Sequence, residues 1–402
     1  MILLLEISLV FLLIRKKGFV SPYVIIFLIS FIYLKAVYID FLLFGIIPTL
    51  NITIPIIPSF DGQTYLLYDF LCFSYFFSFF ITAYFFHDNK ILNNGHLVTT
   101  NTFLSSGYNF IFILLIIYNI YCAMDGIDLT RVERGNSQTP FMLIMRNSIN
   151  YFFIFIFSAQ FKTKNLFRAL FIITSIIYLL LSYEREPLVI FFLCGIYKYK
   201  LYLKPTLLIL VSVCLLLILN IWKLFYTSVL YSDGNGFAYF TQYVNNDHYF
   251  SLAGLDPKIS FLLFYNYLDN MSLYSDYYFS YITGVINQFH RFLFYSEYKT
   301  LAEYSSEKFT AGNFGTAFSF MLESMLNFWY LGPSIIAVVL CYFVKKSIFL
   351  IQKYGIGVVV ILIFITMKFM RTELATLLKL QVFPLLISMI IFKSMVKKFL
   401  YK

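Results

Sequence analysis

Five arginines in this sequence stand between long apolar segments, in linkers whose other charged side chains are mainly acidic. A guanidinium group binds phosphate oxygens in pairs through its planar set of donors, and it keeps its charge at any working pH. It can therefore neutralise the charge that develops on a leaving diphosphate without a metal ion. The alternative is structural, because such residues can also reach lipid phosphates from a helix end or pair with a neighbouring acid. These residues are Arg131, Arg134, Arg185, Arg291 and Arg371.

Arg185 is the first of these candidates. It lies in the sequence Tyr-Glu-Arg-Glu-Pro-Leu at residues 183–188, between two apolar segments. Proline disfavours a helical conformation in the residue before it, so a helix break is expected here, at the level of the lipid headgroups. The diphosphate of a lipid-linked substrate would lie at that level. We assign Arg185 and Arg291 to catalysis, and we assign Arg185, Arg371, Arg131 and Arg134 to diphosphate binding.

Transfer of a sugar from such a donor also requires a group that takes the proton of the attacking hydroxyl. Histidine and carboxylate side chains are suited to this task. The longest linker contains His248 and His290, and we take His290 as the catalytic candidate. A lone histidine in an aromatic-rich segment is also often structural or merely exposed. The acidic alternatives, which the sequence does not rank, are Asp40, Glu303 and Glu323.

Motifs for nucleotide or metal use are missing from the sequence. There is no GxxxxGK[ST], GxGxxG, HExxH or DxD, and there are only four histidines, so neither a cofactor nor a metal is predicted. The five cysteines lie in or beside apolar segments without CxxC spacing, which is typical of buried small side chains. The net charge of +10 comes from short basic clusters, not from one basic face, so nucleic acid is not an expected partner.

The composition assigns the chain to the membrane. Hydrophobic residues make up 60% of it and charged residues 12%, about half the charged share of a soluble domain. Because one crossing needs about 20 apolar residues, we predict an all-α polytopic membrane protein with about 11 (10–12) transmembrane helices and one large outer loop. The expected spans are residues 1–14, 20–39, 65–86, 102–122, 140–161, 166–182, 185–197, 205–225, 317–344, 355–370 and 377–392.

Successive linkers alternate between basic and acidic, which indicates their side of the membrane. Basic residues gather near 15–17, 90, 162–168, 198–204, 345–353 and 393–402. Cytoplasmic loops carry an excess of Lys and Arg. The N-terminus is therefore expected outside and the C-terminus in the cytoplasm.

The longest linker, residues 226–316, lies on the outer side in this topology and contains 14 of the 34 tyrosines. Tyrosine suits both stacking on sugar faces and packing at the headgroup level. Apolar residues recur with helical spacing between Val285 and Leu293, the pattern of a helix lying on the membrane. We predict an N-terminal bundle at 1–225, the outer loop at 226–316 and a C-terminal bundle at 317–402.

Three short motifs resemble those of the O-antigen polymerases, the Wzy-type polymerases of oligosaccharide repeat units in bacterial inner membranes. They are residues 183–188, Thr-Ala-Gly-Asn-Phe-Gly-Thr at 310–316, and Leu-Gly-Pro at 331–333. The second motif is also what a simple loop-to-helix turn would contain, with Thr316 as the N-cap. The span count and the aromatic composition agree with the resemblance.

The resemblance implies a metal-independent glycosyltransferase of GT-C-like helical architecture. Such enzymes act on the outer face of the inner membrane and move a growing glycan from undecaprenyl diphosphate onto a new lipid-linked repeat. The implied partners are the lipid-linked oligosaccharide, the lipid bilayer, a chain-length regulator and a flippase. Three alternatives stay open: an O-antigen ligase that transfers glycan to lipid A core, a flippase for lipid-linked oligosaccharides, and a membrane scaffold. The long outer loop argues against the flippase.

Overall fold

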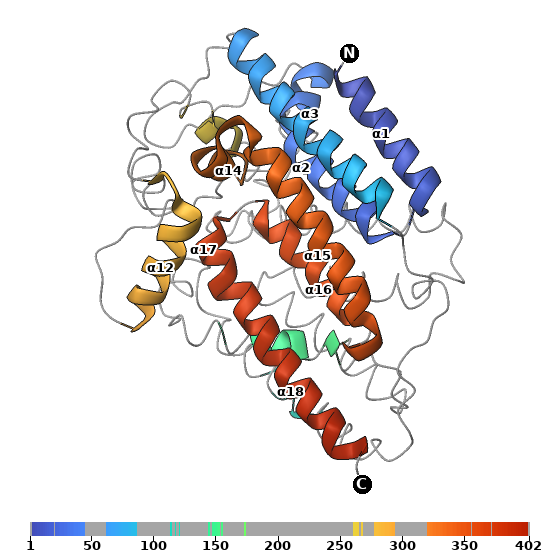
Figure 1. The fold of residues 1–402 in the computed structure, drawn as a ribbon, viewed down its shortest axis with the longest axis vertical. Coiled ribbons are helices and arrows are strands. Elements are labelled where there is room, and N and C mark those ends of the chain that lie inside the picture. Colours follow the sequence, from blue (N-terminus) through green and yellow to red (C-terminus); the bar gives the residue numbers. More distant parts are fainter. Residues whose placement is uncertain are drawn as a thin grey trace, which may run out of the picture.

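The computed structural model describes residues 2–19, 21–44, 62–86, 260–264, 267, 277–293, 320–354, 356–370 and 372–400, with short pieces between 113 and 173. Regular structure in these residues is helical (Figure 1), which confirms the all-α prediction for this part of the chain. Four described segments are long and apolar enough to cross a membrane, in agreement with a membrane protein: Pro22–Asp40, Leu66–Phe85, Phe320–Ile351 and Leu374–Lys393.

Three helices of the N-terminal part pack against one another: α1 (Ile2–Lys17), α2 (Pro22–Phe44) and α3 (Gly62–Phe85). The turn between α1 and α2 depends on Gly18, whose φ of 81° lies in the left-handed region that ends many helices. Its N–H donates to the Ile14 carbonyl at 2.8 Å. Pro22 then starts α2, because the first turn of a helix needs no N–H from this residue.

The apolar segment predicted as one span at 317–344 is broken in the structure. Helix α14 (Phe320–Phe328) is followed by a 3₁₀ turn at Trp329–Leu331 and then by α15 (Gly332–Tyr354). A Cβ placed on Gly332 would lie 2.2 Å from the Ser324 carbonyl oxygen. If residues 324 and 332 belonged to one straight helix, they would be about 12 Å apart. The chain therefore folds back on itself. Pro333 explains the new start, because proline is tolerated in the first turn of a helix and not in its interior.

The C-terminal part consists of α16 (Gly357–Phe369) and a second long helix that contains a π-helical turn: α17 (Leu374–Leu377), the π turn Leu378–Val382 and α18 (Phe383–Leu400). Pro384 has no N–H to donate to the preceding turn. The Leu380 carbonyl, four residues earlier, instead accepts a hydrogen bond of 2.7 Å from Asn147 Nδ2. A side chain from another part of the chain thus satisfies the interrupted backbone.

The helix predicted from the apolar stripe at 285–293 is present as α12 (Ser280–Leu293). Ile282 and Ile286 on it are more than 60% exposed, so one apolar face of α12 lies on the protein surface. The helix packs against α14 and α17 (Figure 1). It therefore ties the long predicted loop to the C-terminal helices.

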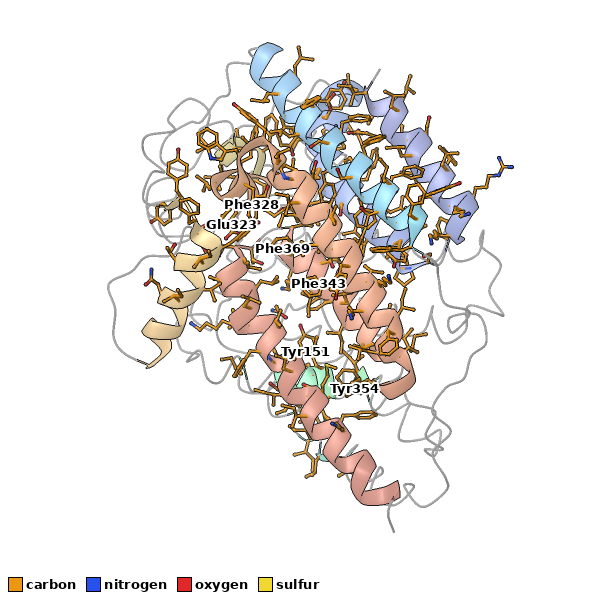
Figure 2. The ribbon with its side chains drawn as sticks, viewed as in Figure 1. Tyr151, Glu323, Phe328, Phe343, Tyr354 and Phe369 are labelled. Carbon is orange, nitrogen blue, oxygen red and sulfur yellow. The ribbon has the colours of Figure 1, made fainter. Side chains whose placement is uncertain are left out.

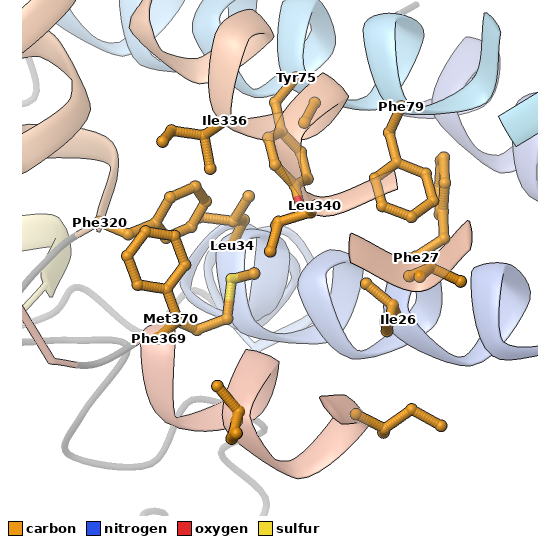
Figure 3. Close-up of a cluster of buried hydrophobic side chains, with 14 of the residues drawn as sticks. Ile26, Phe27, Leu34, Tyr75, Phe79, Phe320, Ile336, Leu340, Phe369 and Met370 are labelled. Carbon is orange, nitrogen blue, oxygen red and sulfur yellow. The ribbon is translucent and has the colours of Figure 1, made fainter. Parts of the chain in front are cut away.

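One hydrophobic core joins the three predicted regions. Figure 3 shows the part of this core where α2 and α3 meet α14, α15 and α16. The ring of Phe320 lies 5.4 Å from Tyr75 and 5.8 Å from Phe369, which connects α14 with α3 and α16. Phe261 and Phe264 of the long linker lie about 5 Å from the ring of Tyr68 on α3. The predicted boundaries near 225 and 316 fall outside the described residues.

Basic side chains gather at one end of the bundle. Lys17 donates to the Phe86 carbonyl, and Lys345 lies 4.5 Å from the centre of the Phe86 ring. The C-terminal ends of α1 and α3 therefore meet the later part of α15. Helix α1 starts and α18 ends at opposite ends of the bundle (Figure 1). The side of the membrane on which each end lies stays a prediction.

Several predicted spans match observed helices. Segments 20–39, 65–86 and 355–370 correspond to α2, α3 and α16, and 377–392 lies within α17 to α18. Helix α1 extends the predicted 1–14 but has only 16 residues, shorter than a usual crossing. The described residues within 102–122 and 140–161 are helical, and 166–182, 185–197 and 205–225 lie outside the described residues apart from Ile173. The count of eleven stays a prediction.

Candidate functional site

Two buried carboxylates meet at the end of the bundle opposite the basic side chains. Glu323 on α14 is 1% exposed, and Glu373, the residue before α17, is 3% exposed. The Leu374 N–H donates to Glu323 Oε2 at 2.9 Å, so Glu323 satisfies a free backbone donor at the start of α17. Thr376 Oγ1 donates to Glu373 Oε1 at 2.8 Å. Both carboxylates are thus held in place, and they lie close enough to interact electrostatically.

Asn327 connects this carboxylate pair to the first turn of α12. Its Nδ2 donates to Ser280 Oγ at 2.9 Å and to the Glu323 carbonyl at 2.7 Å, while its Oδ1 accepts from the Tyr281 N–H at 2.9 Å. Ser280 also hydrogen-bonds the Glu323 side chain. One amide therefore joins α12 and α14 around the carboxylates. Figure 2 shows Glu323 and Phe328 together at this end of the bundle.

Tyr281 supplies a hydroxyl that no described residue satisfies. Its ring centre lies 5.8 Å from that of Phe328, and its buried Oη has no hydrogen-bond partner among the described residues. Burial and the neighbouring Glu323 carboxylate raise the pKa of Tyr281 well above its usual value, so the hydroxyl stays protonated at neutral pH. A buried polar group left without a partner costs about 1–3 kcal/mol. This hydroxyl is therefore available to donate to a bound molecule.

Of the residues singled out from the sequence, Glu323 is the one that the structure describes in this cluster. His290 and Arg291 belong to α12, which packs on α14 and α17, and their side chains lie outside the described residues. Arg371 also lies outside them, although its neighbour Glu373 is part of the cluster. The remaining site predictions, which fall outside the described residues, are Arg131, Arg134, Arg185 and Glu303.

Neither Glu373 nor Tyr281 was predicted as functional from the sequence. Glu373 is two residues from Arg371, and Tyr281 is one of 14 tyrosines in the long linker. Asp40, another predicted acid, is 1% exposed on α2 and has contacts of its own. The signal that could have ranked Glu323 was its position inside an apolar segment, because an ionisable group there needs a partner or a function.

A second buried polar cluster lies among α1, α2 and α3. Lys35 Nζ lies 2.9 Å from Glu6 Oε1 and also pairs with Asp69 Oδ1. Glu6 and Lys35 are at most 1% exposed, and Asp69 is 7% exposed. All three charges interrupt apolar segments, which is the sequence signal that would have pointed to them. Two acids and one base in this arrangement hold three helices together.

No known protein family, curated protein or solved structure matches this chain. The chemistry of the carboxylate cluster must therefore be argued from its own groups. An ionised carboxylate can accept a proton from a hydroxyl group that is held next to it. Tyr281 adds a donor, and Ser280 and Asn327 position the pair. Such a cluster is suited to bind hydroxyl-rich molecules and to take a proton from one of them.

Proposed function

We propose that this protein polymerises lipid-linked oligosaccharide repeat units into a surface polysaccharide, O-antigen or capsule. The single observation that carries the proposal is the buried pair Glu323 and Glu373 at the end of the bundle opposite Lys17 and Lys345. Because lysine-rich ends face the cytoplasm, this pair would lie at the outer face of the inner membrane, where flipped lipid-linked sugars are found. The resemblance of residues 183–188, 310–316 and 331–333 to O-antigen polymerases points to the same activity.

In the proposed reaction the growing glycan moves from its undecaprenyl diphosphate to a sugar hydroxyl at the non-reducing end of a new lipid-linked repeat. Glu323 or Glu373 takes the proton of that hydroxyl, whose oxygen forms a bond to the anomeric carbon of the donor. The bond from that carbon to the diphosphate oxygen breaks, and its electrons leave with undecaprenyl diphosphate. Arg185, with Arg371, neutralises the charge on the leaving group.

The helix α12 belongs to the same proposal. It starts at the carboxylate pair with Ser280 and Tyr281, and it carries His290 and Arg291 further along. In the proposal, Arg291 contacts the diphosphate and His290 is a second proton acceptor. Arg131 and Arg134 would add to the diphosphate site from another outer linker.

Deletion of the gene tests the activity directly. Surface polysaccharide from the deletion strain is run on a gel beside wild type and beside strains complemented with Arg185→Ala or Glu323→Gln. Collapse of the long ladder to a single repeat on the core supports polymerisation. Loss of all decoration, single repeat included, would instead favour flipping or ligation.

The Glu323→Gln variant has a matched control. Its amide oxygen can still accept from the Leu374 N–H, so the fold is retained while the proton acceptor is lost. We expect polymerisation to fall by about 10²–10⁴-fold, the usual contribution of general base catalysis. Asp40→Asn changes another buried acid, on α2, and should leave the ladder normal. A normal ladder with Glu323→Gln and with Glu373→Gln would remove the pair from the mechanism.

A further inference from the structure

Two residues beside the contact between α12 and α14 have an unusual backbone. Phe279 and Trp329 have φ values of 63° and 55°, and they are the non-glycine residues with positive φ in the described part of the chain. Bulky residues adopt this left-handed conformation only at an energetic cost, and such strain gathers at functional sites. Glycine would fit either position without strain. An aromatic side chain therefore stands at each position in spite of the backbone strain.

Both strained residues lie next to the groups that connect α12 with α14. Phe279 immediately precedes Ser280, and Trp329 stands two residues after Asn327, which donates to Ser280 Oγ at 2.9 Å. The contact between the Tyr281 and Phe328 rings, 5.8 Å apart, joins the same two turns. The two aromatic residues therefore stand next to the same contact between α12 and α14, which also holds Glu323.

The rings of Phe279 and Trp329 are exposed although they are large and apolar. Phe279 is 64% exposed and Trp329 is 72% exposed, while the neighbouring Tyr281 has a buried hydroxyl that no described residue satisfies. An aromatic face beside carboxylate, amide and hydroxyl groups matches a sugar ring, which has an apolar C–H face and an edge of hydroxyls. A lipid tail would match the rings and not the polar groups of the neighbouring residues.

We propose that Phe279 and Trp329 form the subsite that stacks on a sugar ring of the incoming acceptor repeat, with Tyr281 donating to one of its hydroxyls. This proposal rests on the proposed function, and it assigns the residues that bind the acceptor repeat. A tryptophan that merely anchors the protein in the headgroup region needs no left-handed backbone, because an ordinary helix end can present it there. Leu331, 69% exposed on the same turn, shows that exposure alone does not require positive φ.

The chain contains two tryptophans, Trp222 and Trp329, so a Trp222→Phe variant carries a single fluorophore at the subsite. The variant is reconstituted in liposomes, and its emission is followed while the soluble oligosaccharide repeat, released from the host's own lipid-linked donor, is added. We expect a saturable change in Trp329 emission that an unrelated disaccharide does not produce. No change at any concentration of the repeat would overturn the proposal. Strong quenching by brominated lipid tails in that case identifies Trp329 as a bilayer anchor.

Substitution by glycine separates binding from folding. Trp329→Gly removes the ring and relieves the backbone, so the variant should melt no lower than wild type while the half-saturating concentration of acceptor rises about three- to ten-fold. Leu331→Ala, on the same turn, is the control and should leave that concentration unchanged. Equal effects of the two variants would refute stacking. If gene deletion leaves polysaccharide length unchanged while Trp329 still responds to the repeat, the polymerase assignment fails and the sugar subsite stands.

Discussion

Replacement of Lys35 by methionine tests how the first three helices are held together. Methionine keeps most of the side-chain length but removes the ammonium group, so Glu6 and Asp69 are left as two buried carboxylates without a counter-charge. Both are at most 7% exposed, and the ammonium lies 2.9 Å from Glu6 Oε1. Breaking a buried ion pair by removing one partner typically costs about 3–5 kcal/mol. We expect a loss of stability of that size.

The loss can be measured with thiols that the fold itself conceals. Cys72 and Cys341 are fully buried, so in a background where the other three cysteines are replaced by serine, a maleimide dye that fluoresces on reaction with thiols reports their exposure as the detergent-solubilised protein unfolds. At roughly 2 °C per kcal/mol for a chain of this size, the melting temperature should fall by about 5–10 °C. Lys346→Met, which changes an exposed lysine on α15, is the matched control and should melt like wild type.

A triple variant identifies the cause of the loss. With Lys35→Met, Glu6→Gln and Asp69→Asn together, no net charge remains to be buried, and most of the lost stability should return. An unchanged melting temperature for Lys35→Met would show that the ion pairs do not hold the bundle. A triple variant as unstable as the single one would show that packing around Lys35, and not charge, is responsible.

Three further outcomes follow from the fold. Gly332→Ala should prevent stable folding, because its Cβ would lie 2.2 Å from a backbone oxygen of α14. Gly18→Ala has open space around its Cβ and should lower the stability by only about 1 kcal/mol, because of its positive φ. The dye assay compares the melting temperatures of the two variants. Asn147→Leu should lower the melting temperature, because the Leu380 carbonyl loses its hydrogen bond. In a Pro384→Ala background, where residue 384 has a backbone N–H to donate, the same substitution should lower the melting temperature less. Equal losses in both backgrounds would contradict this account. A reporter fused after the last residue should lie in the cytoplasm, and a reporter inserted near residue 235 should lie on the outer side. If both reporters lie on the same side, the span count is wrong.

Helix positions were predictable because their signals are local. Apolar segments bounded by polar residues placed α2, α3 and α16 within a few residues, and the spacing from Val285 to Leu293 was enough to expect α12. The break at Trp329–Leu331 was missed, although Gly332 and Pro333 had been noticed. The hydropathy of the chain does not change at this break, so hydropathy alone predicts one span. The fold-back is seen only from the contact of Gly332 with α14.

The candidate site was much harder to predict than the helices. Glu323 and Glu373 are 50 residues apart, and Tyr281 belongs to a third segment, so no spacing rule connects them. The same holds for Glu6, Lys35 and Asp69, which stand one on each of three helices. Each charge could be recognised alone as unusual in an apolar segment, but its partner could not be named.

The sequence alone determined that this chain is helical and belongs in a membrane. Those properties follow from the number and order of apolar residues, because each segment must satisfy its backbone internally wherever lipid surrounds it. Tertiary structure decided which charges share a buried site and where the chain turns back after α14. It also decided that Asn147 donates a hydrogen bond to the Leu380 carbonyl. These features depend on how helices pack against each other, and packing joins residues that lie far apart in the chain.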